Sequence, residues 1–201
     1  MRLLDTTRTT LLLTLALGAV STAQAQARAR DMHPDMAMAP GTTMVGGQAM
    51  FRTKDIVDNA VNSSDHTTLV AAVKVAGLVE TLKGSGPFTV FAPTNAAFGL
   101  LPEGTVPTLL RPENKQQLTR VLTYHVVAGR YDASALMKAI KQGHGSAMLT
   151  TVAGEPLTLS MNGERNIVVR DAKGDVADIS TYDVVQSNGV IHVVDRVLLP
   201  S

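Results

Sequence analysis

The chain contains no cysteine. Disulfide scaffolds, thiolate zinc sites, iron–sulfur clusters and cysteine nucleophiles are therefore all excluded. It also lacks tryptophan, and its aromatic residues are limited to three Tyr and four Phe. That number is too small to build a stacking platform for single-stranded nucleic acid.

An excess of one charge sign is also missing. The 18 Lys and Arg nearly balance the 17 Asp and Glu, so no basic surplus is available to follow a phosphate backbone. Together with the scarcity of aromatic residues, this balance argues against a nucleic-acid partner. The chain does have 201 residues, of which 45% are hydrophobic, which is enough for one folded domain with a core but short for two.

Residues 1–25 have the pattern of an export signal. Arg2 and Arg8 precede an apolar run over residues 11–20, and the small residues Ala23 and Ala25 match a cleavage site. The apolar run is about half of the ~20 residues that a bilayer-spanning helix needs. We therefore predict cleavage after Ala25 and an exported product, periplasmic or extracellular, whose mature chain has no transmembrane segment.

Residues 26–50 are rich in Ala, Met, Pro and Gly and show no regular apolar period, so we predict a flexible linker. Thioether and imidazole groups are ligands that suit Cu(I). The segment offers a set of them: Met32, His33, Met36, Met38 and Met44. Two interpretations stay open, a tether with a chance Met cluster or the capture arm of a periplasmic carrier for copper or another small ligand.

A compact domain is predicted from residue 51 to residue 201. Its first part has apolar residues at helical spacing, and from Met148 onward the apolar period becomes two. Helices are expected around residues 56–61, 65–77, 78–82, 95–100, 113–127 and 133–140, with a loop over 102–112. Strands are expected around residues 88–92, 149–152, 157–161, 167–170, 176–179 and 190–199. Helices segregated ahead of a strand-rich half indicate an α+β fold with an antiparallel sheet.

Two further local features carry predictions. Asn162-Gly163 and Asn188-Gly189 are typical of tight hairpin turns, in which Gly supplies a positive φ. Phe88, Phe91 and Phe98 lie within eleven positions of one another and are predicted to form a core nucleus. The last strand is apolar on both faces, which predicts a central position in the sheet.

Three segments resemble the fasciclin (FAS1) domain family, in the family's order. They are Thr89-Val90-Phe91-Ala92-Pro93-Thr94-Asn95-Ala96-Ala97-Phe98, the Tyr124-His125 pair, and Asn188-Gly189-Val190-Ile191-His192-Val193-Val194-Asp195 with Leu199-Pro200. The resemblance covers about residues 51–201 and is closest to a bacterial secreted type with a single domain. It implies a β-wedge of mainly antiparallel strands with a cluster of short helices, used for adhesion and for binding at the matrix or cell surface.

The resemblance also marks four candidate partner-binding residues. It points to Tyr124 and His125 as a candidate adhesion epitope, whereas a Tyr and a His on the inner stripe of a helix usually serve the core. For Thr94 and Asn95 the alternatives are capping of a helical turn and contact with a ligand. Both alternatives stay open for each pair.

No catalytic motif is present in the sequence. It has no G-x-S-x-G elbow and no phosphate loop, and the five His show no zinc-binding spacing of i, i+4. We therefore predict a non-enzymatic module without a cofactor that binds a protein or polysaccharide at the cell surface or matrix. The alternatives are the copper or small-ligand carrier and a hydrolase whose site leaves no recognisable motif.

Overall fold

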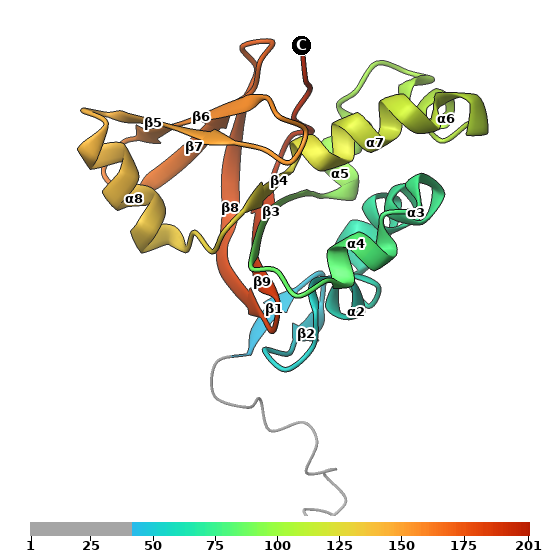
Figure 1. Cartoon of the computed structure of the whole chain (residues 1–201), viewed down its shortest axis with the longest axis horizontal. Coiled ribbons are helices and arrows are strands. Elements are labelled where there is room, and N and C mark those ends of the chain that lie inside the picture. The colour runs from blue at the N-terminus through green and yellow to red at the C-terminus, as the bar shows by residue number, and fades with distance from the viewer. Residues whose placement is uncertain (1–41) are drawn as a thin grey trace, which may run out of the picture. The chain divides into compact units, whose positions relative to one another are not determined.

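The computed structural model describes residues 42–201 (Figure 1). The predicted export signal, residues 1–25, lies outside the described residues, as does most of the predicted linker. Among residues 42–201 no helix is both long enough and apolar enough to cross a bilayer.

Short helices dominate the first half of the described chain, because capping residues and glycines interrupt it often. Asp55 begins α2 by accepting a hydrogen bond from the N–H of Asp58 at 2.8 Å, and Gly77 ends α3 at φ 75°. The helices and 3₁₀ turns are α2 (Ile56–Ala60), η2 (Ser64–His66), α3 (Thr67–Ala76), α4 (Val79–Lys83), α5 (Asn95–Gly99), α6 (Thr105–Leu109), η3 (Pro112–Asn114), α7 (Lys115–Tyr124) and α8 (Ala133–Gln142).

The strands form one large sheet and one small hairpin. The hairpin pairs β1 (Thr43–Val45) with β2 (Gln48–Met50). The large sheet contains β3 (Phe88–Pro93), β4 (Val126–Ala128), β5 (Ser146–Thr150), β6 (Pro156–Asn162), β7 (Asn166–Arg170), β8 (Val176–Gln186) and β9 (Gly189–Val194).

The large sheet has the strand order β4-β3-β9-β8-β7-β6-β5. Every pair is antiparallel except β3 with β9, which run parallel and in register from Phe88 opposite Gly189 to Pro93 opposite Val194. The predicted α+β fold with mainly antiparallel strands is therefore confirmed. The predicted central position of the last strand is also confirmed, since β9 lies between β3 and β8.

The two outer strands of this sheet approach each other. Val127 in β4 forms an isolated bridge with Thr151 just after β5, and Val152 donates from its backbone N–H to the carbonyl of Val126 at 2.7 Å. The sheet therefore curls strongly, as the natural twist of β-strands favours. Both of its faces are covered: Figure 1 shows α3, α4 and α7 on one side of the strands and α8 on the other.

The sheet separates two hydrophobic cores. One lies under the helical cluster of α2 to α7 and receives Val90, Ile191 and Val193 from the central strands. The other lies between the curled sheet and α8 and receives Phe91 and Val194. Because successive residues of a strand point to opposite faces, β3 and β9 feed both cores at once.

The three phenylalanines do not form one nucleus as predicted. Phe91 is fully buried in the core beside α8, whereas Phe98, together with partly buried Phe88, belongs to the core under the helices. The reason is the strand period: Phe88 and Phe91 are three positions apart, so they leave β3 on opposite faces.

Order begins earlier than the predicted boundary at residue 51. The β1–β2 hairpin occupies residues 43–50, with a turn at Gly46 and Gly47 that has φ of 57° and 71°. Val45 and Met50 are buried and join the core under the helices, which stabilises a hairpin too short to persist alone. Strands of three residues are too short to show a clear period, so the sequence pattern missed them.

Three other boundaries also differ from prediction. The predicted loop over residues 102–112 contains α6, and the predicted helix over 113–127 ends at Tyr124, where the chain turns into β4 to pair with β3. The last strand ends at Val194 rather than Leu199. In the last two cases the tertiary setting decides: pairing with β3 draws residues 126–128 into the sheet, while the chain after Val194 leaves it.

Asn188 links the hairpin between β8 and β9 to the helices. Its Oδ1 accepts from the N–H of Ile56 at 3.1 Å, and its Nδ2 donates to the carbonyls of Leu82 at 2.8 Å and Gly84 at 3.1 Å. The side chain thus serves the backbone of α2 and of the end of α4 from inside the protein. All three partners are backbone groups, and those of Ile56 and Leu82 are buried, so Asn188 is a structural anchor.

The two predicted Asn-Gly turns differ in how they use glycine. Gly163 has the expected positive φ of 77°, but Gly189 does not adopt a positive φ. At Gly189 a side chain would collide with the carbonyl oxygen of Phe88 on the neighbouring strand. Glycine is therefore needed there for the close approach of β3 and not for the turn.

Replacing Asn188 by Ala is expected to destabilise the fold by about 3 kcal/mol, because it removes the partners of the buried backbone groups of Ile56 and Leu82 and of the partly buried carbonyl of Gly84. Urea denaturation followed by circular dichroism measures the change. The matched control is Asn162→Ala in the exposed β6–β7 hairpin, where a change within about 0.5 kcal/mol is expected. Equal effects of the two substitutions would contradict the anchoring role.

Candidate functional site

Tyr124 is the last residue of α7 and is fully buried. Its hydroxyl donates to the carbonyl of Pro156 at 3.0 Å and accepts from the N–H of Ala172 at 2.8 Å. The first partner begins β6, and the second lies in the turn between β7 and β8. The ring fills the core beside α8 while the hydroxyl connects two loops of the sheet.

His125 follows directly and is 2% exposed. Its Nδ1 lies 2.8 Å from the carbonyl oxygen of Val121, and its Nε2 lies 2.9 Å from the backbone nitrogen of Leu198. A carbonyl only accepts and an amide N–H only donates, so the ring is the neutral tautomer with its proton on Nδ1. Burial lowers the pKa of His125 to about 4, although the hydrogen bond to Val121 and the charge of Asp171 oppose the shift.

Asp171 completes the polar connections around this pair. Its Oδ1 accepts from the N–H groups of Lys173 and Asp175, and its Oδ2 accepts from the N–H of Leu199 at 2.9 Å. The carboxylate thus shapes the β7–β8 turn and holds the chain after β9 beside it. The adjacent Leu198 is the residue that bonds His125, so both groups fasten the same C-terminal segment.

Thr94 and Asn95 both act at helix starts. Thr94 caps α5 by accepting from the N–H of Ala97 at 3.2 Å. Asn95 reaches across to the start of α3: its Oδ1 accepts from the N–H of Thr68 at 3.0 Å, and its Nδ2 donates to the carbonyl of Ser64 at 2.8 Å. Asn95 therefore serves backbone groups that the start of a helix leaves without partners.

The structure does not gather the four candidate residues into one open site. Tyr124 and His125 lie inside the protein, so direct contact with a partner would require the fold to open. Their arrangement favours the structural interpretation over the epitope. Thr94 and Asn95 are partly exposed, and their side-chain oxygens accept hydrogen bonds from the chain itself.

The predicted metal ligands Met32, His33, Met36 and Met38 lie outside the described residues, and copper binding there stays a prediction. Met44 lies on β1 and is 49% exposed. Within residues 42–201, no three His, Asp or Glu side chains gather closely enough to hold a metal ion.

One feature of the interior could not be seen in the sequence. A cavity of about 90 Å³ lies between the helical cluster and the sheet, with walls from α2, α3, α4, α7 and β3. His66 is 4% exposed and lines it; its Nδ1 lies 2.9 Å from the hydroxyl of Ser63, and burial lowers its pKa. Packing between many elements that are separate in the sequence creates the cavity, so no local sequence pattern could predict it.

The signature segments match a known domain family over most of the described chain. The family model of the fasciclin domain matches residues 64–200, which include all three signature segments. This chain belongs to the fasciclin domain family. The resemblance seen in the sequence is thereby confirmed.

Several relatives share the fasciclin domain. Protein sll1483 of Synechocystis is 45% identical over 174 residues, covering 83% of this chain and 88% of that protein. Immunogenic protein MPB70 of Mycobacterium bovis is 35% identical over 146 residues, covering 70% and 66%. Transforming growth factor-beta-induced protein ig-h3 of Sus scrofa is 35% identical over 150 residues, covering 72% of this chain and 19% of that protein.

A solved structure supports the same fold. It is a FAS1 domain pair from the insect cell adhesion molecule fasciclin I, with a TM-score of 0.64 and 20% sequence identity. The alignment covers 73% of this chain and 51% of that one. The fasciclin fold thus persists where few residues are shared.

The buried histidines predict an acid-sensitive fasciclin domain. The pKa of His125 is about 4 in the folded protein, against an ordinary value of 6.5, so between these values the unfolded chain binds the extra proton. Stability is therefore complete above about pH 6.5 and falls as the pH decreases toward 4, on the order of 3 kcal/mol for His125. The pKa values of His66 and His192 are also lowered, mainly by burial, and add in the same direction.

Urea denaturation between pH 7 and pH 4.5 measures this loss. His125→Gln keeps a donor and an acceptor but cannot titrate, so its stability is expected to fall less over this range than that of the unmodified protein. His144→Gln, in an exposed loop, is the control and should keep the full pH dependence. An unchanged pH slope in His125→Gln would show that the loss originates elsewhere.

Proposed function

We propose that this fasciclin domain is an exported, non-enzymatic module that binds a protein or polysaccharide at a cell surface or in a matrix. Membership of the family supports the proposal, as does the likeness of the fold to a domain pair from an insect cell adhesion molecule. The pattern of residues 1–25, with its cleavage signal at Ala25, supports export.

One observation carries the proposal: the polar groups of the family signature are used inside the chain. Tyr124 and His125 hold loops and the C-terminal segment, while Thr94 and Asn95 serve helix starts. A catalytic group has to reach a substrate atom, whereas these side chains form hydrogen bonds with backbone groups of the chain itself. We therefore assign partner binding to the exposed surface of the domain, whose underlying fold these residues stabilise.

The exposed end of α5 is the part of the signature region best placed for recognition. Leu100 closes α5 as its C-terminal cap and is 63% exposed, a high value for a large apolar side chain. It follows the same helix that Asn95 begins, and Asn95 is partly exposed. Interfaces depend on a few apolar or aromatic anchors within a polar surround, and Leu100 fits that role.

Replacing Leu100 by Lys is expected to weaken binding at least about fivefold, because it removes an apolar anchor and introduces a charge. Binding is measured by biolayer interferometry, with the purified protein on the sensor and cells or surface polysaccharide of the producing organism in solution. The melting temperature should stay unchanged, since the side chain is largely in water.

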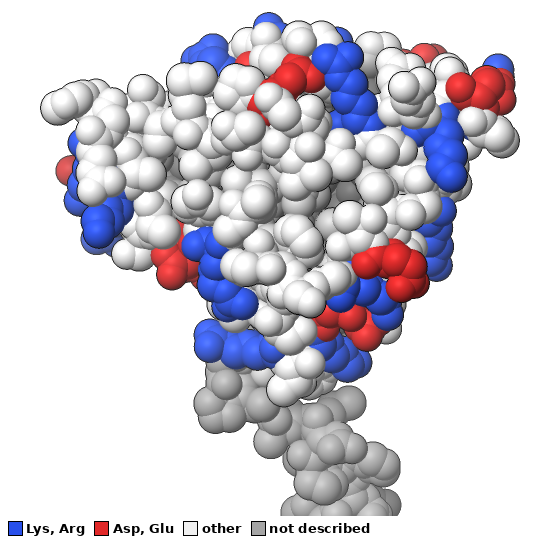
Figure 2. Space-filling model, viewed as in Figure 1, with Lys and Arg blue, Asp and Glu red and all other residues white. Residues whose placement is uncertain are grey.

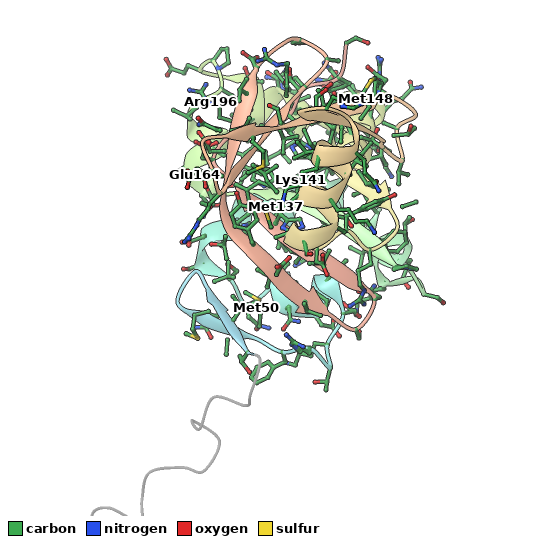
Figure 3. All side chains as sticks on the ribbon, turned by 90° about the vertical axis from the view of Figure 1, so that its left-hand side faces the viewer. Met50, Met137, Lys141, Met148, Glu164 and Arg196 are labelled. Atoms are coloured by element: carbon green, nitrogen blue, oxygen red, sulfur yellow. The ribbon has the colours of Figure 1, made fainter. Side chains whose placement is uncertain are left out.

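Met148→Lys on β5 is the matched control. Met148 is 69% exposed and lies on the strand at the far edge of the sheet (Figure 3), so binding should be unaffected. Equal losses in both variants would mean that the site is not at α5. Absence of saturable binding to either cells or polysaccharide would contradict the proposed function itself.

A further inference from the structure

The chain contains two Asn-Gly dipeptides, and the structure places them in opposite environments. They are Asn162-Gly163 between β6 and β7 and Asn188-Gly189 between β8 and β9. An asparagine followed by glycine loses its side-chain ammonia more readily than other asparagines, because glycine has no Cβ to hinder attack by its backbone nitrogen. The reaction requires a side chain that can turn and a following N–H group that is free to react. The sequence marks both positions equally, so the environment decides between them.

Asn162 is in the exposed environment. It is the last residue of β6, and both it and Gly163 are exposed. Among residues 42–201, no hydrogen bond engages the side chain of Asn162 or the backbone N–H of Gly163. At Gly163, where φ is 77°, no atom beyond its chain neighbours lies within 4 Å of the position that a Cβ would occupy. The side-chain amide can therefore rotate toward the backbone nitrogen without breaking a hydrogen bond.

Asn188 is in the opposite situation. It is 7% exposed, and its Oδ1 accepts from the N–H of Ile56 while its Nδ2 donates to the carbonyls of Leu82 and Gly84. Gly189 belongs to β9, which is paired with β3 on one side and with β8 on the other. Attack at Asn188 would break three side-chain hydrogen bonds and shift a central strand, so it requires local unfolding.

We propose that Asn162 is a site of spontaneous deamidation in the folded protein, which converts it to aspartate and isoaspartate. The backbone nitrogen of Gly163 gives up its proton to solvent and bonds to the side-chain carbonyl carbon of Asn162. The bond from that carbon to the side-chain nitrogen breaks, and the nitrogen leaves as ammonia after taking a proton from solvent. Water then opens the cyclic imide at either of its carbonyl carbons. Opening at the side-chain carbonyl gives aspartate, and opening at the main-chain carbonyl gives isoaspartate.

The products differ from asparagine in charge and in backbone length. Both carry a carboxylate instead of a neutral amide, close in sequence to Glu164, which is exposed and lies at the margin of the molecule in Figure 3. In isoaspartate the main chain runs through the side chain and is a methylene longer. Asn162 forms the last pair of the β6–β7 ladder with Asn166, so the added length falls at the tip of the hairpin. The fully buried Leu159 and Val169 hold the rest of the two strands in place.

The added charge makes the reaction measurable. The 18 Lys and Arg and the 17 Asp and Glu nearly balance, and Figure 2 shows both signs in small groups over the face that it presents. A new carboxylate therefore shifts the elution of the protein in ion-exchange chromatography. During incubation of the purified protein at mildly alkaline pH, an acidic species is expected to accumulate. Peptide mapping by mass spectrometry measures conversion at each asparagine, which should be at least about tenfold faster at Asn162 than at Asn188.

Two comparisons separate the effect of the fold from that of the sequence. In urea, which removes the contacts of Asn188, both Asn-Gly positions should react at rates within about threefold of each other. Asn162→Gln should form no acidic species, because the longer side chain would have to close a larger ring. Asn166→Gln on β7 is the matched control and should leave the rate unchanged, since Asn166 precedes Ile167 rather than glycine.

Three results would overturn the proposal. They are equal conversion of Asn162 and Asn188 in the folded protein, an acidic species that persists in Asn162→Gln, and an Asn162 that stays intact in the folded protein while the chain in urea is converted. The surface binding tested with Leu100→Lys depends on none of them, so failure here leaves the proposed function intact.

Discussion

The fold depends on one constraint: β9 must be apolar on both of its faces. It pairs in parallel with β3 and antiparallel with β8, and all six of its residues are buried. Its side chains therefore enter the core under the helices and the core beside α8 alternately. It shares this role with β3, which also sends side chains into both cores, and β9 joins β3 to the rest of the sheet through β8.

The polar residues of the family signature stabilise the margins of this arrangement. Asn188 binds the β8–β9 turn to α2 and α4, and Asn95 joins α5 to α3. Tyr124 and His125 connect α7 to the sheet loops and to the segment after β9. Most of these links join elements distant in sequence, which explains why such short helices hold a defined position. A scaffold of this kind leaves its exterior free to vary, and recognition by its surface follows naturally.

The two cores are filled to different degrees. The core beside α8 contains many fully buried side chains, including Leu136, Leu157 and Ile167, and is enclosed by the curl of the sheet. The core under the helices is covered by short α-helices of five to ten residues each. Short helices cannot interdigitate along their length, so space remains between them, and the cavity beside α3 lies there.

Much of the fold could be predicted from the sequence because its signals are local. Asp55, Thr94 and Asp132 cap the helices expected to follow them, and the two-residue period after Met148 reproduces the strands of the second half. The early hairpin at residues 43–50 and the strand β4 escaped prediction, since three-residue strands exist only through their partners. The parallel pairing of β3 with β9 was likewise invisible, because no local pattern records which distant strand lies alongside.

For the candidate site, too, some features could be predicted from the sequence and others could not. The resemblance to the fasciclin family singled out Tyr124, His125, Thr94 and Asn95, and the residue types left a structural or a binding role open for each. Burial favours the structural role for Tyr124 and His125, and burial is a property of the assembled chain. The sequence by itself determined the family, the fold class and the candidate residues. Only the tertiary structure decided which of them face inward and where the cavity lies, because both depend on contacts between segments far apart in the chain.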